Sequence, residues 1–467
     1  MKNTYFDLID QTYYFPQEGF DLRDNYLTFH GISLKYLIQK YKTPFKITYL
    51  PRIGEQIKRA KNLFNRAIKN YQYEGKYYYC YCTKCSHFSH VILEALANQV
   101  HLETSSAFDL DLINRLQKKH KIRKNILLVH NGFKTKEYLD KILQLHESGF
   151  ENSICVLDNT DELMRISDQA KKQIKIGIRM AVDEEPQASY YTSRLGIRRD
   201  DIMSFVKNKI VPNNKVQLKM LHFFIDSGIR DNIYYWGEFG KAIALFVELK
   251  KICPSLTSIN IGGGLPIRNN LGFEFDYKYM ISEIVRNIKD ICSNEQVQEP
   301  DIFSEFGKYT VAESGATIFT VVAQKKQNDA ELWYLVNNSL MNTIPDSWGI
   351  FERFILLPIN KWTNEYTRVN IGGISCDHLD YYNSEEHNQQ IFLPRFSEAE
   401  QDPLHIGFFH TGAYQDAISG YGGIKHCLIP SPKHIIVNRN EKGDYIDHIY
   451  REEQHVNDML SILGYGQ

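Results

Sequence analysis

The feature that most constrains the fold is a repeated alternation of two patterns between residues 44 and 307. Short apolar stretches rich in β-branched and aromatic residues are each followed by a longer amphipathic stretch with Lys and Glu, as in β/α units. Eight candidate strands follow one another, and they cover residues 77–84, 100–105, 125–131, 153–159, 174–181, 216–224, 256–263 and 301–307. Their continuous apolar runs indicate parallel strands that are buried on both faces.

Eight such units predict a (β/α)8 barrel of the TIM type, within the α/β class. A doubly wound open sheet is the alternative, but no Gly-x-Gly-x-x-Gly motif opens the first unit, as that fold would favour. After residue 312 the pattern changes to strands separated by turns, with little helix, which predicts an all-β domain. We therefore expect a barrel domain over residues 42–312 and a β-sheet domain formed by residues 1–41 and 313–467.

Composition argues against several classes of function. The net charge of −1 over 467 residues gives no basic excess for binding nucleic acid. No apolar run is long enough to span a bilayer, and the N-terminal segment has no apolar core of a signal peptide. The eight cysteines are expected to stay reduced, so we expect a cytoplasmic protein.

The reactive groups of such a barrel lie at the carboxyl ends of its strands. Lys84 ends the first candidate strand, and Glu305 lies near the end of the eighth. A lysine in this position is either a Schiff-base nucleophile, whose amine has a pKa lowered by desolvation, or the partner of an acid such as Glu103. The residues alone leave both interpretations open.

Three consecutive glycines, Gly262, Gly263 and Gly264, follow the seventh candidate strand. Glycines allow backbone N–H groups to approach a phosphate closely, although turns also use glycine freely. A phosphate-binding loop, an amine and a carboxylate on one rim suit pyridoxal phosphate. The amine holds the aldehyde, and the carboxylate keeps the pyridine nitrogen protonated.

Longer segments carry a resemblance to a known family. The segment YCYCTKCSH (79–87) is similar to the lysine segment of the fold type III, or alanine racemase-like, pyridoxal phosphate decarboxylases. Further segments match in the family's order, and they are HLETSSAFDLDLINRL, HNGFK, GIRM, TSRLGI, LHFFIDSGI, INIGGGLPI, SEFGKYTVAESG, ISCDHLD and FFHTGAYQ. The match covers nearly the whole chain and most resembles the shorter arginine decarboxylases, which implies pyridoxal 5′-phosphate as the cofactor.

The resemblance also implies roles for individual residues. Lys84 would bind the cofactor aldehyde, Glu305 would pair with the pyridine nitrogen, and Arg179 would lie near the cofactor. The cofactor phosphate would be surrounded by Ser227, Gly262, Gly263, Gly264 and Tyr414. In this family two subunits of a homodimer share each active site, so Cys376 and Asp377 would complete the site across the dimer interface.

Three positions depart from the family pattern. Phe224 stands where the family stacks a histidine on the cofactor ring, and His222 lies two residues earlier on the same strand face. Asp226 replaces the glycine before Ser227, and Lys308 replaces an arginine on the phosphate side. Phe224 can still stack by its ring face, and Lys308 keeps the positive charge but not the forked geometry of arginine. We therefore count His222, Phe224 and Lys308 among the expected cofactor-binding residues.

Cys376 and Asp377 suit the chemistry of decarboxylation. The carbanion left by loss of CO2 must be protonated, and the Cys376 thiol can donate that proton. Asp377 can bind the cationic end of a substrate, and a guanidinium would form a bidentate pair with it. The resemblance thus predicts decarboxylation of L-arginine to agmatine in polyamine biosynthesis. Ornithine, lysine and carboxynorspermidine stay as alternative substrates, and a cofactor-free, decarboxylase-like regulatory binding protein is the alternative of another class.

The cysteine-rich segment at residues 80–85 raises the alternative of a metal site. On a strand, Cys80, Cys82 and Lys84 would share one face, and Cys85 would point the other way. Same-face neighbours about 6.6 Å apart are too widely spaced for three thiolates to converge on one zinc ion. We expect no metal here, and we expect Cys80 and Cys82 to fill the barrel interior. The acids within residues 182–197 are interpreted as part of a solvated loop.

Overall fold

The computed structural model describes residues 3–9, 14–183, 191–386 and 389–466. Part of the segment 182–197, with Glu184 and Glu185, lies outside the described residues, so the interpretation as a solvated loop stays a prediction there. The chain divides into two compact units. The barrel unit consists of Gly54–Pro266 and Phe275–Thr310, and the sheet unit consists of Met1–Ile53, Ile267–Glu274 and Val311–Gln467. The functional domain boundaries expected at residues 42 and 312 stay predictions.

Within the described part of the barrel unit, eight parallel strands close on themselves. In barrel order they are β5 (Tyr77–Cys82), β6 (His101–Thr104), β7 (Leu128–His130), β8 (Ser153–Leu157), β9 (Ile174–Ala181), β11 (Val216–His222), β12 (Ser258–Asn260) and β13 (Asp301–Glu305). The two-residue strand β10 (Ile197–Arg198) pairs with β9 at the edge. Closure occurs because β13 pairs with β5, so the predicted (β/α)8 barrel is confirmed and the open sheet is wrong.

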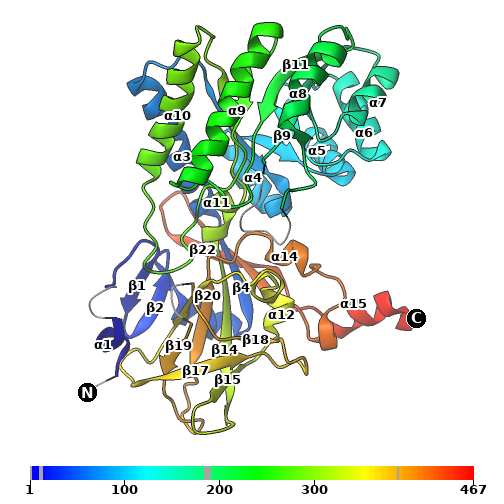
Figure 1. Ribbon diagram of the computed structural model, residues 1–467. Helices are drawn as coiled ribbons and strands as arrows, with labels where there is room; N and C mark the ends of the chain where they lie inside the picture. The colour runs from blue at the N-terminus through cyan, green and yellow to red at the C-terminus, as the bar shows by residue number, and fades with distance from the viewer. Residues whose placement is uncertain (1–2, 10–13, 184–190, 387–388, 467) are drawn as a thin grey trace. The chain divides into compact units, whose positions relative to one another are not determined.

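Helices surround the barrel strands (Figure 1). They are α3 (Leu50–Asn70), α4 (Ser89–Ala97), α5 (Ala107–Lys118), α6 (Lys136–Glu147), α7 (Asp161–Gln169), α8 (Arg199–Phe205), α9 (Ile233–Ile252), α10 (Tyr277–Asn294) and α11 (Lys308–Val311), of which α3 and α11 cross the division between the units. Several begin where a side-chain oxygen accepts a hydrogen bond from a free backbone N–H of the first turn. Ser106, Thr135 and Asn232 cap α5, α6 and α9 in this way. None of the helices in the described ranges combines the length and apolar character of a membrane span.

Small, aliphatic and aromatic side chains fill the barrel interior. The buried cluster there consists of Cys80, Val129, Ile154, Val156, Met220 and Phe303. Cys80 is fully buried in this cluster, which confirms that it acts as a small apolar residue of the core. A packed interior leaves the carboxyl ends of the strands as the place for chemistry.

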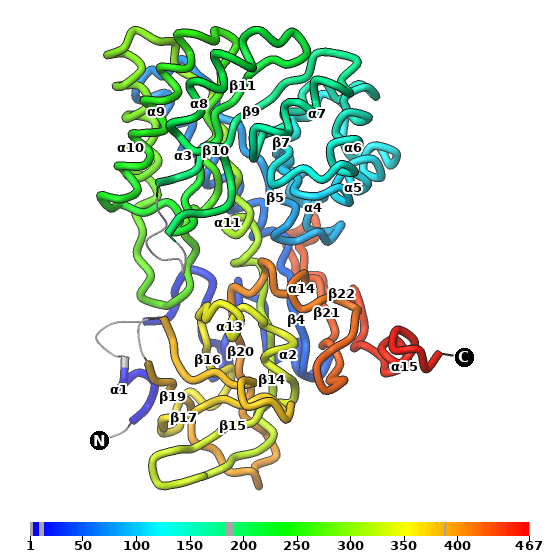
Figure 2. The backbone as a smooth tube through the Cα atoms, turned by 45° about the vertical axis from the view of Figure 1, so that its right-hand side comes forward, coloured from blue at the N-terminus to red at the C-terminus, as the bar shows by residue number. Residues whose placement is uncertain are grey.

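The sheet unit is built mainly from antiparallel strands, as expected for the chain after residue 312. Its strands are β1 (Phe20–Arg23), β2 (Tyr26–Phe29), β3 (Ile32–Ser33), β4 (Phe45–Tyr49), β14 (Gly315–Lys326), β15 (Leu332–Val336), β16 (Ile355–Pro358), β17 (Tyr366–Gly372), β18 (Tyr381–Tyr382), β19 (Ile391–Pro394), β20 (His405–Phe409), β21 (Lys433–Arg439) and β22 (Tyr445–Arg451). In Figure 2 the early segment β4 runs beside the late segment β21, with which it pairs. Its short helices are α1 (Tyr5–Ile9), α2 (Leu34–Tyr41), α12 (Leu340–Thr343), α13 (Asp346–Gly349), α14 (Gln415–Ile418) and α15 (Val456–Leu460).

The long strand β14 organises the sheet unit. It pairs with β4, β15 and β20, so segments that are far apart in the sequence lie side by side. One apolar core packs around Phe45, Ile318 and Phe409, and a second packs around Phe319 and Phe408. Neighbouring residues of β14 thus enter two different cores because successive side chains point to opposite faces of a strand.

Candidate active site

Glu305 lies at the centre of a buried hydrogen-bond cluster in the barrel unit. It is the last residue of β13, and its Oε1 accepts hydrogen bonds from the side-chain amides of Asn131 (2.8 Å) and Asn260 (2.6 Å). Nε2 of His222, the last residue of β11, lies 3.1 Å from Oε2. Burial works to raise the pKa of Glu305, but the charge and hydrogen bond of His222, the Asn131 amide and the charge of Lys84 hold it well below its usual range. Glu305 is therefore ionised at neutral pH.

The cluster leaves room for one more hydrogen bond to Glu305. An ionised carboxylate has about four lone-pair sites, two on each oxygen. The two amides occupy those of Oε1, and His222 occupies one of those of Oε2. The remaining site on Oε2 can accept a hydrogen bond from a cationic ring N–H.

Lys84 lies in a short 3-10 turn, Thr83–Cys85, and not on β5, which ends at Cys82. The expectation that Lys84 continues the strand face of Cys80 and Cys82 is therefore wrong, because the backbone leaves the sheet before it. Lys84 is exposed to solvent. The negative charge of Glu103 raises the pKa of its amine and outweighs the opposite effect of desolvation by neighbouring atoms. The Schiff-base interpretation expected the pKa of the Lys84 amine to be lowered. That expectation is wrong for the chain without cofactor.

Glu103 is the source of this negative charge. It lies on β6 and is fully buried. Burial raises its pKa, and the charge of Lys84 opposes that shift. The negative charge of Glu103 therefore attracts the Lys84 amine and favours its charged form.

A close contact joins the turn of Lys84 to the end of β13. Sγ of Cys82 donates a hydrogen bond to the backbone carbonyl of Glu305 (3.0 Å). A Cβ added at Gly307 would lie 2.1 Å from Sγ of Cys85 and 2.9 Å from Cβ of Cys82. Only glycine fits at position 307 without moving the turn, so the amine-bearing turn and the acid-bearing strand end are packed directly together.

Arg179, Phe224 and the glycine loop (residues 262–264) form a second group. The Arg179 guanidinium on β9 lies 5.5 Å from the centre of the Phe224 ring, within range of a cation–π contact. A Cβ added at Gly262, whose φ is +68°, would lie 3.0 Å from Cδ2 of Phe224. A Cβ at Gly263 would lie 2.7 Å from the carbonyl oxygen of Glu305. The loop therefore lies between the Phe224 ring and the Glu305 cluster.

The glycine loop also packs against the turn that carries Ser227. The N–H of Ile229 donates a hydrogen bond to the carbonyl of Gly264 (2.9 Å). Ser227 is half-buried. Asp226, which replaces the family's glycine at this position, is exposed, so this substitution faces solvent. Lys308 is half-buried and begins α11, directly after Gly307.

In the sheet unit, the loop between β17 and β18 carries Cys376 and Asp377. Asp380 holds this Cys376 loop (residues 373–380) in place. Its buried carboxylate accepts hydrogen bonds from the N–H groups of Met341 (3.0 Å) and Ser375 (3.2 Å), and its carbonyl accepts one from the N–H of Gly373 (2.8 Å). A Cβ added at Gly373 would lie 2.1 Å from Oδ2 of Asp380.

A second segment, His426–Cys427, lies beside Cys376 and Asp377. The two Sγ atoms of Cys376 and Cys427 are 3.5 Å apart, and Nε2 of His426 lies 3.7 Å from Oδ2 of Asp377. The hydrogen bond and the charge of Cys427 raise the pKa of the exposed Cys376 thiol. Cys376 therefore carries its proton at neutral pH, as a proton donor must.

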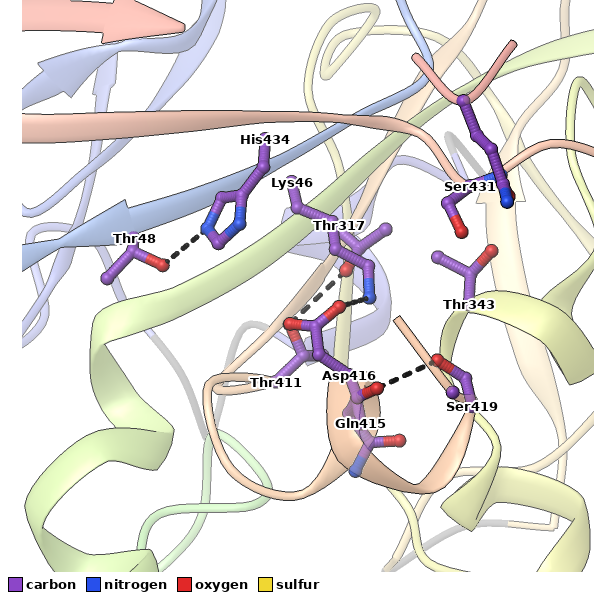
Figure 3. A network of polar contacts seen from close by, with 12 residues as sticks. Lys46, Thr48, Thr317, Thr343, Thr411, Gln415, Asp416, Ser419, Ser431 and His434 are labelled. Carbon is purple, nitrogen blue, oxygen red and sulfur yellow. Dashed lines mark hydrogen bonds and ion pairs between the residues drawn. The ribbon is translucent and has the colours of Figure 1, made fainter. Parts of the chain in front are cut away.

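Tyr414 precedes α14 with a φ of +67°. A buried polar network fixes the residues that follow it (Figure 3). Nζ of Lys46 on β4 lies 2.5 Å from Oδ1 of Asp416, and the Gln415 amide donates a hydrogen bond to Asp346 (2.8 Å). Because Lys46 and Gln415 are buried, these contacts fix the backbone from which the Tyr414 side chain extends.

Residues 53–312 match the family model described as "Pyridoxal-dependent decarboxylase, pyridoxal binding domain". The chain belongs to this family. The expected family of pyridoxal phosphate decarboxylases and the expected cofactor are thereby confirmed. Pyridoxal-dependent decarboxylases release CO2 from an amino acid, so the chain is a carboxy-lyase.

Relatives of this decarboxylase cover most of its length. The biosynthetic arginine decarboxylase of Prochlorococcus marinus (strain MIT 9215) is 23% identical over 93% of this chain and 85% of that protein. Among solved structures, the biosynthetic arginine decarboxylase SpeA from Campylobacter jejuni aligns with a TM-score of 0.79 and 21% identity, over 98% of this chain and 90% of that chain. A diaminopimelate decarboxylase from M. jannaschii aligns with a TM-score of 0.76 and 19% identity, over 95% and 97%. These likenesses confirm the fold.

The barrel residues fit the cofactor of the pyridoxal-dependent decarboxylases. Glu305 is ionised and has one lone-pair site left for a protonated pyridine nitrogen. Lys84 is exposed where an aldehyde can reach it, and Gly262 and Gly263 pack so closely that an added Cβ would lie 2.6 Å and 2.7 Å from the carbonyl oxygens of Phe223 and Glu305. The roles of these residues, like those of Arg179, His222, Ser227, Lys308 and Tyr414, stay predictions.

Several residues of the candidate site were missed. Asn260 is one residue whose role a signal in the sequence could have revealed, because it ends a buried strand two residues before the glycine loop. The sequence predicted His222 as a cofactor-binding residue, but it gave no sign of its hydrogen bond to Glu305. For His426 and Cys427 the chain offers no local signal, since Cys427 is 51 residues from Cys376.

Proposed function

We propose that this decarboxylase acts on a basic amino acid and converts L-arginine to agmatine and CO2, in polyamine biosynthesis. The observation that carries the proposal is the buried cluster in which His222, Asn131 and Asn260 hold Glu305 ionised. Two further points support arginine as the substrate. Relatives over most of the chain are named biosynthetic arginine decarboxylase, and Asp377 offers a carboxylate that suits a guanidinium.

The barrel residues bind and orient the cofactor. When bound, pyridoxal phosphate supplies an electron-accepting ring that stabilises the charge developing as the carboxyl group leaves. Nζ of Lys84 would hold the aldehyde end, and Oε2 of Glu305 would accept a hydrogen bond from the ring N–H. Phe224 would pack against the ring, with the Arg179 guanidinium next to Phe224. The phosphate would be held by Ser227, Gly262, Gly263, Gly264, Lys308 and Tyr414.

Cys376 and Asp377 complete the proposed reaction. The thiol of Cys376 donates the proton that replaces CO2 on the substrate carbon, and its exposure allows it to regain a proton from water. Asp377 binds the guanidinium and so places the carbon near the thiol. The proposal includes a cytoplasmic homodimer in which these two residues serve the site of the partner subunit. The eight free cysteines support a reducing compartment.

Two measurements test the proposed function. Purified protein with added pyridoxal phosphate should fix the cofactor on Lys84 after borohydride reduction, as found by peptide mass spectrometry. CO2 release is then measured with arginine, ornithine, lysine and carboxynorspermidine. Arginine should give the highest kcat/KM. An inert arginine beside a reactive ornithine or carboxynorspermidine would overturn the substrate, and the lack of any lysine-bound cofactor would favour the regulatory alternative.

A further inference from the structure

The two exposed thiols of this chain lie next to each other. All eight cysteines are among the described residues, and six of them are buried: Cys80, Cys82, Cys85, Cys155, Cys253 and Cys292. The two exposed cysteines are Cys376 and Cys427, and their Sγ atoms are 3.5 Å apart. Exposed thiols are the ones that oxidants in solution can reach.

A single short helix supports both cysteine segments. The N–H of Met341 on α12 donates to the Asp380 carboxylate, which holds the Cys376 loop. The next residue, Asn342, holds the turn of Cys427 from both sides. Its Nδ2 donates to the carbonyl of His426 (3.0 Å), and its Oδ1 accepts a hydrogen bond from the N–H of His426 (3.1 Å). The closeness of the two thiols therefore results from hydrogen bonds that fix the backbone of both segments, and not from side-chain rotation alone.

We propose that Cys376 and Cys427 form a reversible disulfide within one chain, which makes this pair a modification site that switches off the enzyme. The sulfur atoms need to approach by about 1.5 Å to reach the S–S bond length of about 2.05 Å. The oxidant is a peroxide. A thiolate of the pair attacks it, an S–O bond forms, the O–O bond breaks, and the hydroxide that leaves is protonated to water. The second thiol attacks that sulfur, so an S–S bond forms and a second water leaves.

The consequence for activity rests on the proposed function. Cys376 is the proposed proton donor, and in the disulfide it has no proton to give. The sulfur pair has lost two electrons to the peroxide, and a dithiol reductant returns them and restores the thiol. In a reducing compartment such a disulfide is transient, as redox-sensing disulfides are.

Mass spectrometry of the intact enzyme tests the modification. The full chain is treated with hydrogen peroxide, alkylated in denaturant and digested without reduction. A peptide pair that links Cys376 to Cys427 is expected, while the six buried cysteines are alkylated. Absence of this pair, or a covalent dimer linked through Cys376 on a non-reducing gel, would overturn the proposal.

Variants test the switch. Peroxide should lower decarboxylation by the wild type at least tenfold, and dithiothreitol should restore it. The Cys427→Ser enzyme should form no linked peptide. Measured against its own untreated activity, it should regain none with dithiothreitol after peroxide, because its Cys376 is oxidised beyond the disulfide level. The matched control Cys253→Ser, at a buried thiol, should behave as the wild type. Equal recovery of Cys427→Ser would overturn the proposal.

Two further outcomes separate this inference from the proposed function. If the untreated enzyme releases no CO2 from any basic amino acid, the proposed function fails, while peptide mapping still decides whether the disulfide forms. If the disulfide forms and activity is unchanged, the switch is overturned. The Asn342→Ala variant, which frees the Cys427 turn, should form the disulfide several-fold more slowly, and an unchanged rate would contradict the support by α12.

Discussion

The contact between Gly373 and Asp380 gives the sharpest test of how the Cys376 loop is held. Asp380→Ala removes the carboxylate that accepts hydrogen bonds from Met341 and Ser375. Gly373→Ala places a Cβ 2.1 Å from Oδ2 and 2.4 Å from Cγ of Asp380. The two substitutions therefore act on the same feature, because the added methyl group forces the carboxylate away from both N–H donors.

The expected magnitude follows from the two hydrogen bonds. A hydrogen bond to a charged group contributes about 1.5–3 kcal/mol. With the lower value for each bond, Asp380→Ala should lower the free energy of local opening of the loop by about 3 kcal/mol, which is roughly a 150-fold change in the opening equilibrium. Gly373→Ala should cost a similar amount. The double variant should also cost about 3 kcal/mol, and not the sum, since the methyl group no longer meets a carboxylate.

Hydrogen exchange by mass spectrometry measures this effect on peptides that contain residues 371–382. Among these variants, the greater the loss of protection of the loop amides against exchange, the lower the kcat/KM for decarboxylation should be. Gly349→Ala is the matched control, because an added Cβ there meets nothing within 4 Å. Additive losses in the double variant, or exchange in Asp380→Ala that equals the wild type, would refute the reasoning.

Three further predictions concern the acid, the cofactor and the dimer. Burial raises the pKa of Glu313, but nearby positive charges, that of Arg52 among them, lower it to about 2. The ionised Glu313 therefore stabilises the folded state fully above its usual pKa of 4.5, and this stabilisation is lost as the pH falls towards 2. Arg52→Met should therefore raise the midpoint pH of acid unfolding by circular dichroism, and an unchanged midpoint would contradict this. Glu305→Gln should lower kcat about 100-fold or more while the cofactor still binds, and full activity would exclude the proposed role. Mixed dimers of Lys84→Ala and Cys376→Ala chains should regain up to about half of wild-type activity, and verified heterodimers without activity would contradict shared sites.

The barrel could be predicted because its signal is repeated along the chain. Each β/α unit shows an apolar run followed by an amphipathic stretch, and the candidate strand 174–181 matches β9 residue for residue. Strand ends were harder to predict. The run at 77–84 stays apolar or aromatic up to Cys82, but β5 stops there and the backbone turns before Lys84. Hydrophobic periodicity reports burial, and burial continues through this turn at Thr83 and Cys85.

The candidate site could be predicted only where residues lie near a strand end or within a motif. Lys84, Glu305 and the glycine loop met that condition. The pKa of Lys84 depends on the charge of Glu103 on the neighbouring strand, and that balance between burial and charge follows from distances and not from sequence. The pairing of Cys427 with Cys376 depends on hydrogen bonds from the Asn342 side chain to the backbone of His426, for which no pattern in the chain gives a signal.

The contact of Gly307 with Cys85 restricts which substitutions the chain can accept. Any side chain at position 307 would displace the turn of Lys84 and the end of β13 together, and these segments lie far apart in the sequence. A larger residue at 307 should be tolerated only with a smaller one at 85, so the two positions are expected to vary as a pair among related sequences. The distance between the Lys84 amine and the Glu305 carboxylate is therefore set by the packing of Gly307 against Cys85. Substitutions in the outer helices of the barrel can occur without changing this distance.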